Sequence, residues 1–121
     1  MPDRLGCGGV KAEAFHAACL ALPAATLAIQ WGEDRVYKVG GKMFAAVGPS
    51  GGCSLKVSDI AFEALTESGR ARPAPYLARA KWVQFDDLEA VDEAEMTDWL
   101  ASAHAIIAAK LTRAARRELG L

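Results

Sequence analysis

The chain has 121 residues and a mass of 12.8 kDa, enough for one hydrophobic core and too little for two, so we expect residues 1–121 to form a single domain. Hydrophobic residues make up 52% of the chain and charged residues 24%, a globular composition that excludes a disordered or low-complexity protein. The formal net charge of −1 by itself argues against a protein built around nucleic acid.

A first helix is predicted over residues 10–22, because apolar side chains recur there at helical spacing and Pro23 stops the helix. Short runs rich in β-forming residues follow, separated by turns that contain Gly or Asp. These runs are residues 26–31, 35–39, 42–47 and 53–57. The pattern is typical of an antiparallel meander.

Gly40 and Gly41 separate two of these runs, with the spacing of a tight hairpin whose turn needs positive φ. A phosphate-binding loop would instead lead into a helix, and no helix is predicted here. The hairpin predicts these pairs: Val39 with Lys42, Lys38 with Met43, and Tyr37 with Phe44. Because strand side chains alternate, one set should share the buried face: Tyr37, Val39, Phe44 and Ala46. Lys38 and Lys42 then lie near the tip on opposite faces.

A second helix is predicted after the Ser58-Asp59 pair, either of which can cap it, and Gly69 can end it. Its buried stripe is predicted to contain four residues: Ile60, Ala61, Ala64 and Leu65. Residues 70–81 form a basic loop stiffened by prolines, with a short turn at residues 76–80, and they lead into a strand at residues 82–85.

The last helix is predicted to begin at Glu93 and to continue until Gly120 can end it. Its start carries two capping signals: a capping box of Asp92 and Glu95, and a hydrophobic staple of Val91 and Met96. One apolar stripe follows, with Trp99 and Ile107 in the core. The resulting order, α-β-β-β-β-α-β-α, predicts an α+β fold in which helices pack on one face of a twisted antiparallel sheet.

Charge is distributed unevenly along the chain. Residues 35–81 hold eight Lys or Arg against three acids, whereas residues 82–104 hold seven acids and no Lys or Arg. The bases at the end of the last helix complement its dipole: Lys110, Arg113, Arg116 and Arg117. The basic hairpin and loop are not helix ends, and such a surface can neutralise phosphates while an aromatic ring stacks on a base. Lysines also protect edge strands from pairing, and that alternative stays open.

We therefore predict a non-enzymatic module that binds DNA through its phosphates, with weak sequence specificity. The predicted contacts are six cations and two aromatic residues: Lys38, Lys42, Lys56, Arg72, Arg79 and Lys81, with Tyr76 and Trp31. The alternative is a protein-interaction or small-anion-binding module that uses the sheet face and the loop of residues 72–76. A ridge of cations would favour DNA, and a closed pocket would favour a small ligand.

No catalytic residue, metal site or cofactor is predicted, and an enzyme is the least favoured reading. His16 and Cys19 are three residues apart, but further ligands are missing nearby, so a buried thiol beside an exposed imidazole is preferred. His104 is interpreted as a hydrogen-bonded residue at the core edge. Three cysteines without a CxxC pair indicate reduced thiols. With no signal peptide and no membrane span, we expect a cytoplasmic protein, either a monomer or a weak dimer.

Read end to end, the chain resembles the MmcQ/YjbR-like family of small bacterial proteins. Six segments carry the likeness: CLALP at residues 19–23, QWG at 30–32, VYKVGGKMFA at 36–45, SLKVS at 54–58, RPAPYLARAKWV at 72–83 and AAKL at 108–111. The resemblance implies a fold similar to the CyaY/frataxin type. Members are commonly described as DNA-binding proteins with a double wing, which would correspond here to the hairpin of Lys38 and Lys42 and to the neighbouring basic loops.

The chain departs from this family at one position. Many members have Ser followed by Tyr in the last helix, where this chain has Ala103 and His104. Frataxin-like iron binding requires an acidic ridge on the first helix, and this first helix carries only Glu13. Iron chemistry is therefore not implied.

Overall fold

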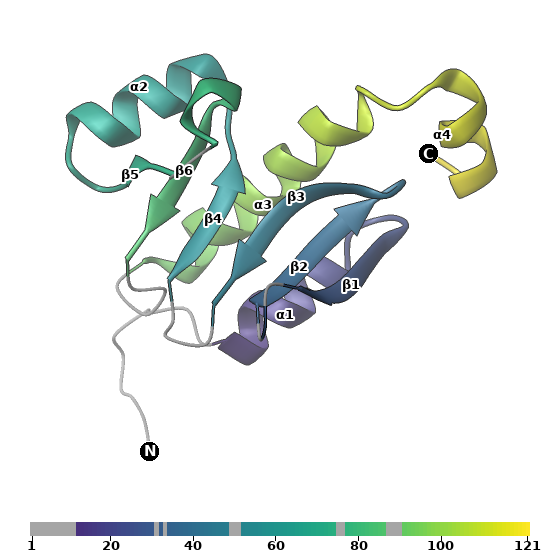
Figure 1. Cartoon of the computed structure of the whole chain (residues 1–121), viewed down its shortest axis with the longest axis horizontal. Helices are drawn as coiled ribbons and strands as arrows, with labels where there is room; N and C mark the ends of the chain where they lie inside the picture. Colours follow the sequence, from purple (N-terminus) through teal and green to yellow (C-terminus); the bar gives the residue numbers. More distant parts are fainter. Residues whose placement is uncertain (1–11, 31, 33, 49–51, 75–76, 87–90) are drawn as a thin grey trace.

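The computed structural model describes residues 12–30, 32, 34–48, 52–74, 77–86 and 91–121. Six strands form one antiparallel sheet in the order β1-β2-β3-β4-β6-β5. The strands are β1 Ala25–Gln30, β2 Asp34–Val39, β3 Lys42–Val47, β4 Cys53–Lys56, β5 Arg72–Pro73 and β6 Trp82–Phe85. The helices are α1 Ala12–Leu20, α2 Asp59–Glu67, α3 Glu93–Ala108 and α4 Arg113–Leu119, with a 3-10 turn, η1, at Ala78–Ala80. This architecture confirms the predicted α+β fold (Figure 1).

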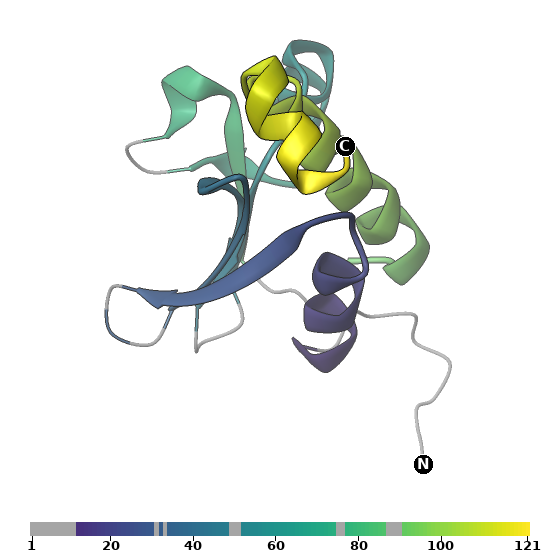
Figure 2. The same cartoon turned by 90° about the vertical axis from the view of Figure 1, so that its right-hand side faces the viewer.

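Helices α1 and α3 cover the same face of the sheet (Figure 2). Helix α3 packs across β2, β3 and β4, and α1 packs against α3 and β1, whereas α2 contacts β5 and β6 at the other end of the sheet. The apolar layer between helices and sheet is the core, and its largest fully buried members are Tyr37, Phe15, Phe44, Leu55, Met96 and Leu100. Burial of this layer is the main favourable contribution to folding.

The β2–β3 hairpin has the predicted turn, with φ of 59° at Gly40 and 80° at Gly41. Two of the predicted pairs are confirmed, Val39 with Lys42 and Lys38 with Met43. The third is wrong, because a bulge pairs Tyr37 with Ala45 and leaves Phe44 as the extra residue. The bulge places Phe44 and Ala45 on the core face, so the buried set continues with Ala45 and Val47 instead of Ala46. No turn signal in the sequence marks such an insertion.

Helix α2 has the predicted cap, since the side chain of Ser58 accepts a hydrogen bond from the backbone N–H of Ala61 at 3.1 Å. Its predicted stripe is wrong in two positions. Ile60 is 84% exposed and Ala64 is also exposed, whereas Phe62 packs beside Ala61 and Leu65 on the core. Because α2 lies at one end of the sheet, it buries a narrower strip than a helix lying across the sheet.

The last helix begins at Glu93 as predicted, and Asp92 accepts a hydrogen bond from the Glu95 N–H at 3.1 Å. Its predicted continuity to Gly120 is wrong. Helix α3 ends at Ala108, and α4 begins at Arg113 after Thr112, whose side chain accepts a hydrogen bond from the Ala115 N–H at 3.0 Å. A threonine that caps a new helix competes with continuation of the old one.

Two further predictions for α3 concern its apolar side. Ile107 is buried, as predicted, whereas Trp99 is half-buried and stacks on Phe85 with ring centroids 5.2 Å apart. His104 is buried, with its Nε2 atom 2.7 Å from the Pro23 carbonyl oxygen and its ring edge-on to Phe44. The interpretation of His104 as a hydrogen-bonded residue at the core is confirmed.

Cys19 and Cys53 are free thiols inside the core. Burial raises the pKa of Cys53 to about 12, and burial, together with the charge of Cys53, also raises the pKa of Cys19. We therefore expect both thiols to resist a disulfide reagent such as DTNB near neutral pH in the folded protein. In a Cys7→Ser background, labelling should wait for unfolding, and denaturant should release two reactive thiols. Rapid labelling of the folded protein would contradict this burial.

Candidate nucleic-acid interface

The predicted contact residues divide into three groups. Trp31 and Tyr76 lie outside the described residues. Arg72 lies on β5 at the far end of the sheet, and Lys38 points to the face of the hairpin opposite Lys42. The remaining predicted residues, Lys42, Lys56, Arg79 and Lys81, belong to chain segments that meet at one end of the inner strands β3, β4 and β6.

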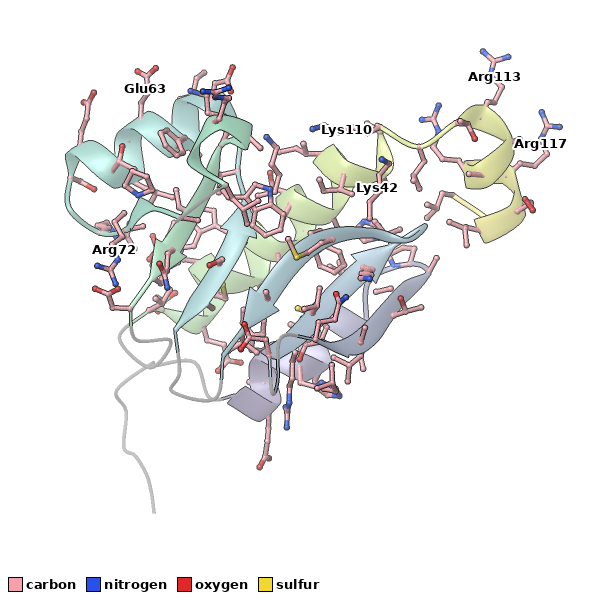
Figure 3. The ribbon with its side chains drawn as sticks, viewed as in Figure 1. Lys42, Glu63, Arg72, Lys110, Arg113 and Arg117 are labelled. Atoms are coloured by element: carbon pink, nitrogen blue, oxygen red, sulfur yellow. The ribbon has the colours of Figure 1, made fainter. Side chains whose placement is uncertain are left out.

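Arg72 forms an ion pair with Asp86. Its guanidinium lies 2.6 Å from the Asp86 carboxylate, and both side chains are exposed. Figure 3 shows Arg72 at the β5 end of the molecule, far from the labelled Lys42 and Lys110. Arg70 is likewise held by two contacts to Glu95, at 2.6 and 3.3 Å, and lies over the Trp99 ring. The exposed position of both pairs keeps their contribution to stability small.

A cavity of about 270 Å³ lies beside these two arginines. Its lining comes from the end of α2, from β5 and from the end of β6: Thr66, Gly69, Arg70, Ala71, Arg72, Pro73, Gln84 and Asp86. Because Arg70 and Arg72 already face carboxylates, this cavity offers little uncompensated positive charge to a small anion.

Lys38 and Lys42 point to opposite faces of the hairpin, as the register requires. Lys42 pairs with Val39 on the face covered by helices, whereas Lys38 pairs with Met43 on the other face. Glycine at position 40 lets the hairpin tip approach the segment after α3: a Cβ atom there would lie 2.6 Å from Leu111 Cδ1. This contact places the tip next to Lys110, and Figure 3 shows Lys42 and Lys110 close together.

Lys56 lies at the end of β4 and is only 8% exposed. Its Nζ atom donates a hydrogen bond to the Ala80 carbonyl oxygen, which ties β4 to η1. Burial and the positive charges of Lys110 and Lys81 lower the pKa of Lys56, while Asp59 opposes them. The three lysines are therefore close enough for their charges to interact. Lys56 adds positive potential from beneath the surface and has little area with which to contact a partner.

Arg79 and Lys81 flank the same carbonyl. Arg79 is exposed on η1, and Lys81 follows η1 with a positive φ of 64°, uncommon for a residue other than glycine. The Lys81 carbonyl oxygen accepts a hydrogen bond from the Val57 N–H at 3.0 Å. The Lys81 Nζ atom lies 4.9 Å from the Phe62 ring centroid. These contacts hold the Lys81 backbone and side chain in place beside the end of β4.

We call this surface the basic edge and define it as Lys42, Lys56, Arg79, Lys81 and Lys110. None of the five lies within 4.0 Å of a carboxylate in the part of the chain that the structure describes. Lys110 was assigned from the sequence to the end of a helix, so its place in this edge was missed. The signal that could have found it is Thr112, because a helix cap at that position ends α3 just before Lys110 and turns the chain toward the hairpin.

Helix α4 continues the positive charge beyond the basic edge. Arg113 and Arg117 extend from α4 on the side of the molecule where Lys110 lies (Figure 3). Within the described ranges, no group of three or more metal-binding side chains is found, and no helix is long and apolar enough to cross a bilayer. This side of the described structure therefore carries cationic side chains, and no group of side chains suited to hold a metal ion accompanies them in the described ranges.

Comparison with known proteins places the chain among its relatives. No curated protein matches it. A crystal structure of protein DR2400 from Deinococcus radiodurans, described as carrying a DUF419 domain, superposes with a TM-score of 0.81 at 24% identity, covering 96% of this chain and 91% of that one. That likeness shows a shared fold. The model of the YjbR family matches residues 20–106, most of the chain, and the chain therefore belongs to the YjbR family.

Proposed function

We propose that this protein binds nucleic acid through the phosphate backbone, along the basic edge. One observation carries the proposal: five cations from four segments of the chain gather at one end of strands β3, β4 and β6, and none of them forms an ion pair with a carboxylate among the described residues. Clustering of like charges costs free energy unless an anion compensates it, and a phosphate backbone supplies such anions at regular intervals. The seven acids of residues 82–104 account for the low net charge, and those that the structure describes form no ion pair with the basic edge.

Three exposed members of the basic edge and the half-buried Lys81 have the chemistry of backbone contacts. Lys42, Lys81 and Lys110 offer ammonium groups, and Arg79 offers a planar guanidinium. Such contacts fix the position of a strand and carry no sequence information, so binding should be weakly specific. The proposal leaves out Arg72, whose charge is engaged by Asp86.

The proposal is tested by the salt dependence of binding. Replacing Lys42 and Lys110 together by Gln should weaken binding to a short DNA duplex and lower the slope of log K against log salt by about 2, since each lost phosphate contact removes about one unit. Fluorescence anisotropy at several salt concentrations measures both quantities. A single strand and heparin, titrated alongside, separate duplex binding from general attraction to polyanions.

Arg72→Gln is the matched control, because it removes one exposed positive charge at the far end of the sheet. It should leave the slope nearly unchanged. Equal salt slopes for the wild type and the double variant would refute binding along the basic edge, as would a loss from Arg72→Gln as large as that from the double variant.

A further inference from the structure

A shallow cavity of about 300 Å³ lies on α4, outside the basic edge. It is lined by Arg113, Arg116, Arg117 and Leu121. The spacing of three and four residues puts the three arginines on one side of the helix. Gly120 has a left-handed φ of 78°, and the N–H of Leu121 donates to the Arg116 carbonyl oxygen at 2.9 Å, which folds the last residue back against the helix.

The three arginines that line this cavity form no ion pair among the described residues. Among the described residues, none of the three guanidinium groups lies within 4.0 Å of a carboxylate, and Glu118 of the same helix does not line the cavity. Like charges three or four residues apart destabilise a short helix. Three cations that line one shallow cavity therefore favour occupation by an anion of high charge.

We propose that the α4 cavity binds the terminal phosphate of a nucleic acid strand, an inference that rests on the proposed function. An internal phosphodiester carries one negative charge and two free oxygens, whereas a terminal phosphomonoester carries close to two charges and three free oxygens. Each guanidinium can donate two parallel hydrogen bonds to phosphate oxygens. Three arginines in one hollow match the terminal group better than an internal one.

The position of α4 supports this assignment. Only Leu111 and Thr112 separate Lys110 from Arg113, the first residue of α4, so the cavity follows directly on the basic edge. Figure 3 shows Arg113 and Arg117 beyond Lys110, away from Arg72. A strand whose backbone lies along the basic edge can thus bring its end to α4.

Duplexes of one sequence, carrying a hydroxyl, a 5′-phosphate or a 3′-phosphate at the ends, test the inference. The wild-type protein should bind one of the phosphorylated duplexes about tenfold more tightly than the hydroxyl duplex, as charge-assisted contacts to an extra phosphate charge require. In the Arg113→Gln, Arg117→Gln double variant this ratio should fall to about one. In the Lys42→Gln, Lys110→Gln variant the affinities for the phosphorylated and the hydroxyl duplex should both fall, while the ratio between these two affinities stays the same. Unfolding curves check that each variant is folded.

The outcomes separate the two proposals. Equal binding of all three duplexes by the wild type overturns the terminal-phosphate site and leaves the basic edge intact. A preference that survives in the Arg113→Gln, Arg117→Gln variant also overturns the site. Failure of the wild type to bind any duplex overturns both proposals.

Discussion

Phe44→Ala should lower the free energy of unfolding by about 3–5 kcal/mol, the usual loss for removing a fully buried phenyl ring. Phe44 has no exposed surface and meets the His104 ring edge-on, with centroids 5.5 Å apart. The bulge in β3 puts this side chain on the same face as Ala45, beneath α3, so its loss leaves a cavity that neighbouring strands cannot close. Denaturant unfolding followed by tryptophan fluorescence measures the change.

Met43→Ala is the control for Phe44→Ala. Met43 is the adjacent residue, half-buried on the opposite face of β3, and its truncation should cost only about 1 kcal/mol. Similar losses from the two substitutions would mean that the bulge does not turn Phe44 into the core.

Gly40→Ala should destabilise the protein by about 2–5 kcal/mol and also weaken DNA binding. A left-handed φ of 59° costs a residue with a Cβ atom about 1–2 kcal/mol. The added methyl group would also lie 2.6 Å from the buried Leu111 side chain, and such overpacking costs about 1–3 kcal/mol. Relief of the clash requires the hairpin tip to move from the end of α3, which separates Lys42 from Lys110. Unfolding curves and duplex titrations measure the two effects.

Gly41→Ala provides the comparison at the next residue. Gly41 also has a left-handed φ, 80°, but a Cβ atom there meets nothing within 4 Å. It should therefore show only the backbone cost of about 1–2 kcal/mol, with DNA affinity retained. If Gly41→Ala weakened binding as much as Gly40→Ala, contact between the hairpin tip and Leu111 would not be what positions the two lysines.

The role assigned to the α4 arginines depends on where the last helices begin and end. In one continuous helix they are bases in the last turns that complement the dipole. In the structure Thr112 starts a separate helix of seven residues, and three arginines line a cavity on it. The family model matches residues 20–106, so this helix lies outside the matched residues.

The sequence by itself determined the α+β class, the order of the main elements, the hairpin turn and the helix caps. These features depend on neighbours along the chain: alternation of side chains, two glycines that accept positive φ, and Ser58 and Asp92 placed to accept backbone hydrogen bonds. The same local logic identified Lys42, Lys56, Arg79 and Lys81 as candidate contacts.

Only the tertiary structure decided which of the predicted cations share a surface. The bulge at Phe44, the exposure of Ile60 and the pairing of Arg72 with Asp86 arise from contacts between segments far apart in the sequence. Burial of Lys56 beside Lys81 and Lys110 likewise requires β4, η1 and the end of α3 to meet. Electrostatic interactions depend on distance in space and on exclusion of water, and neither follows from position along the chain.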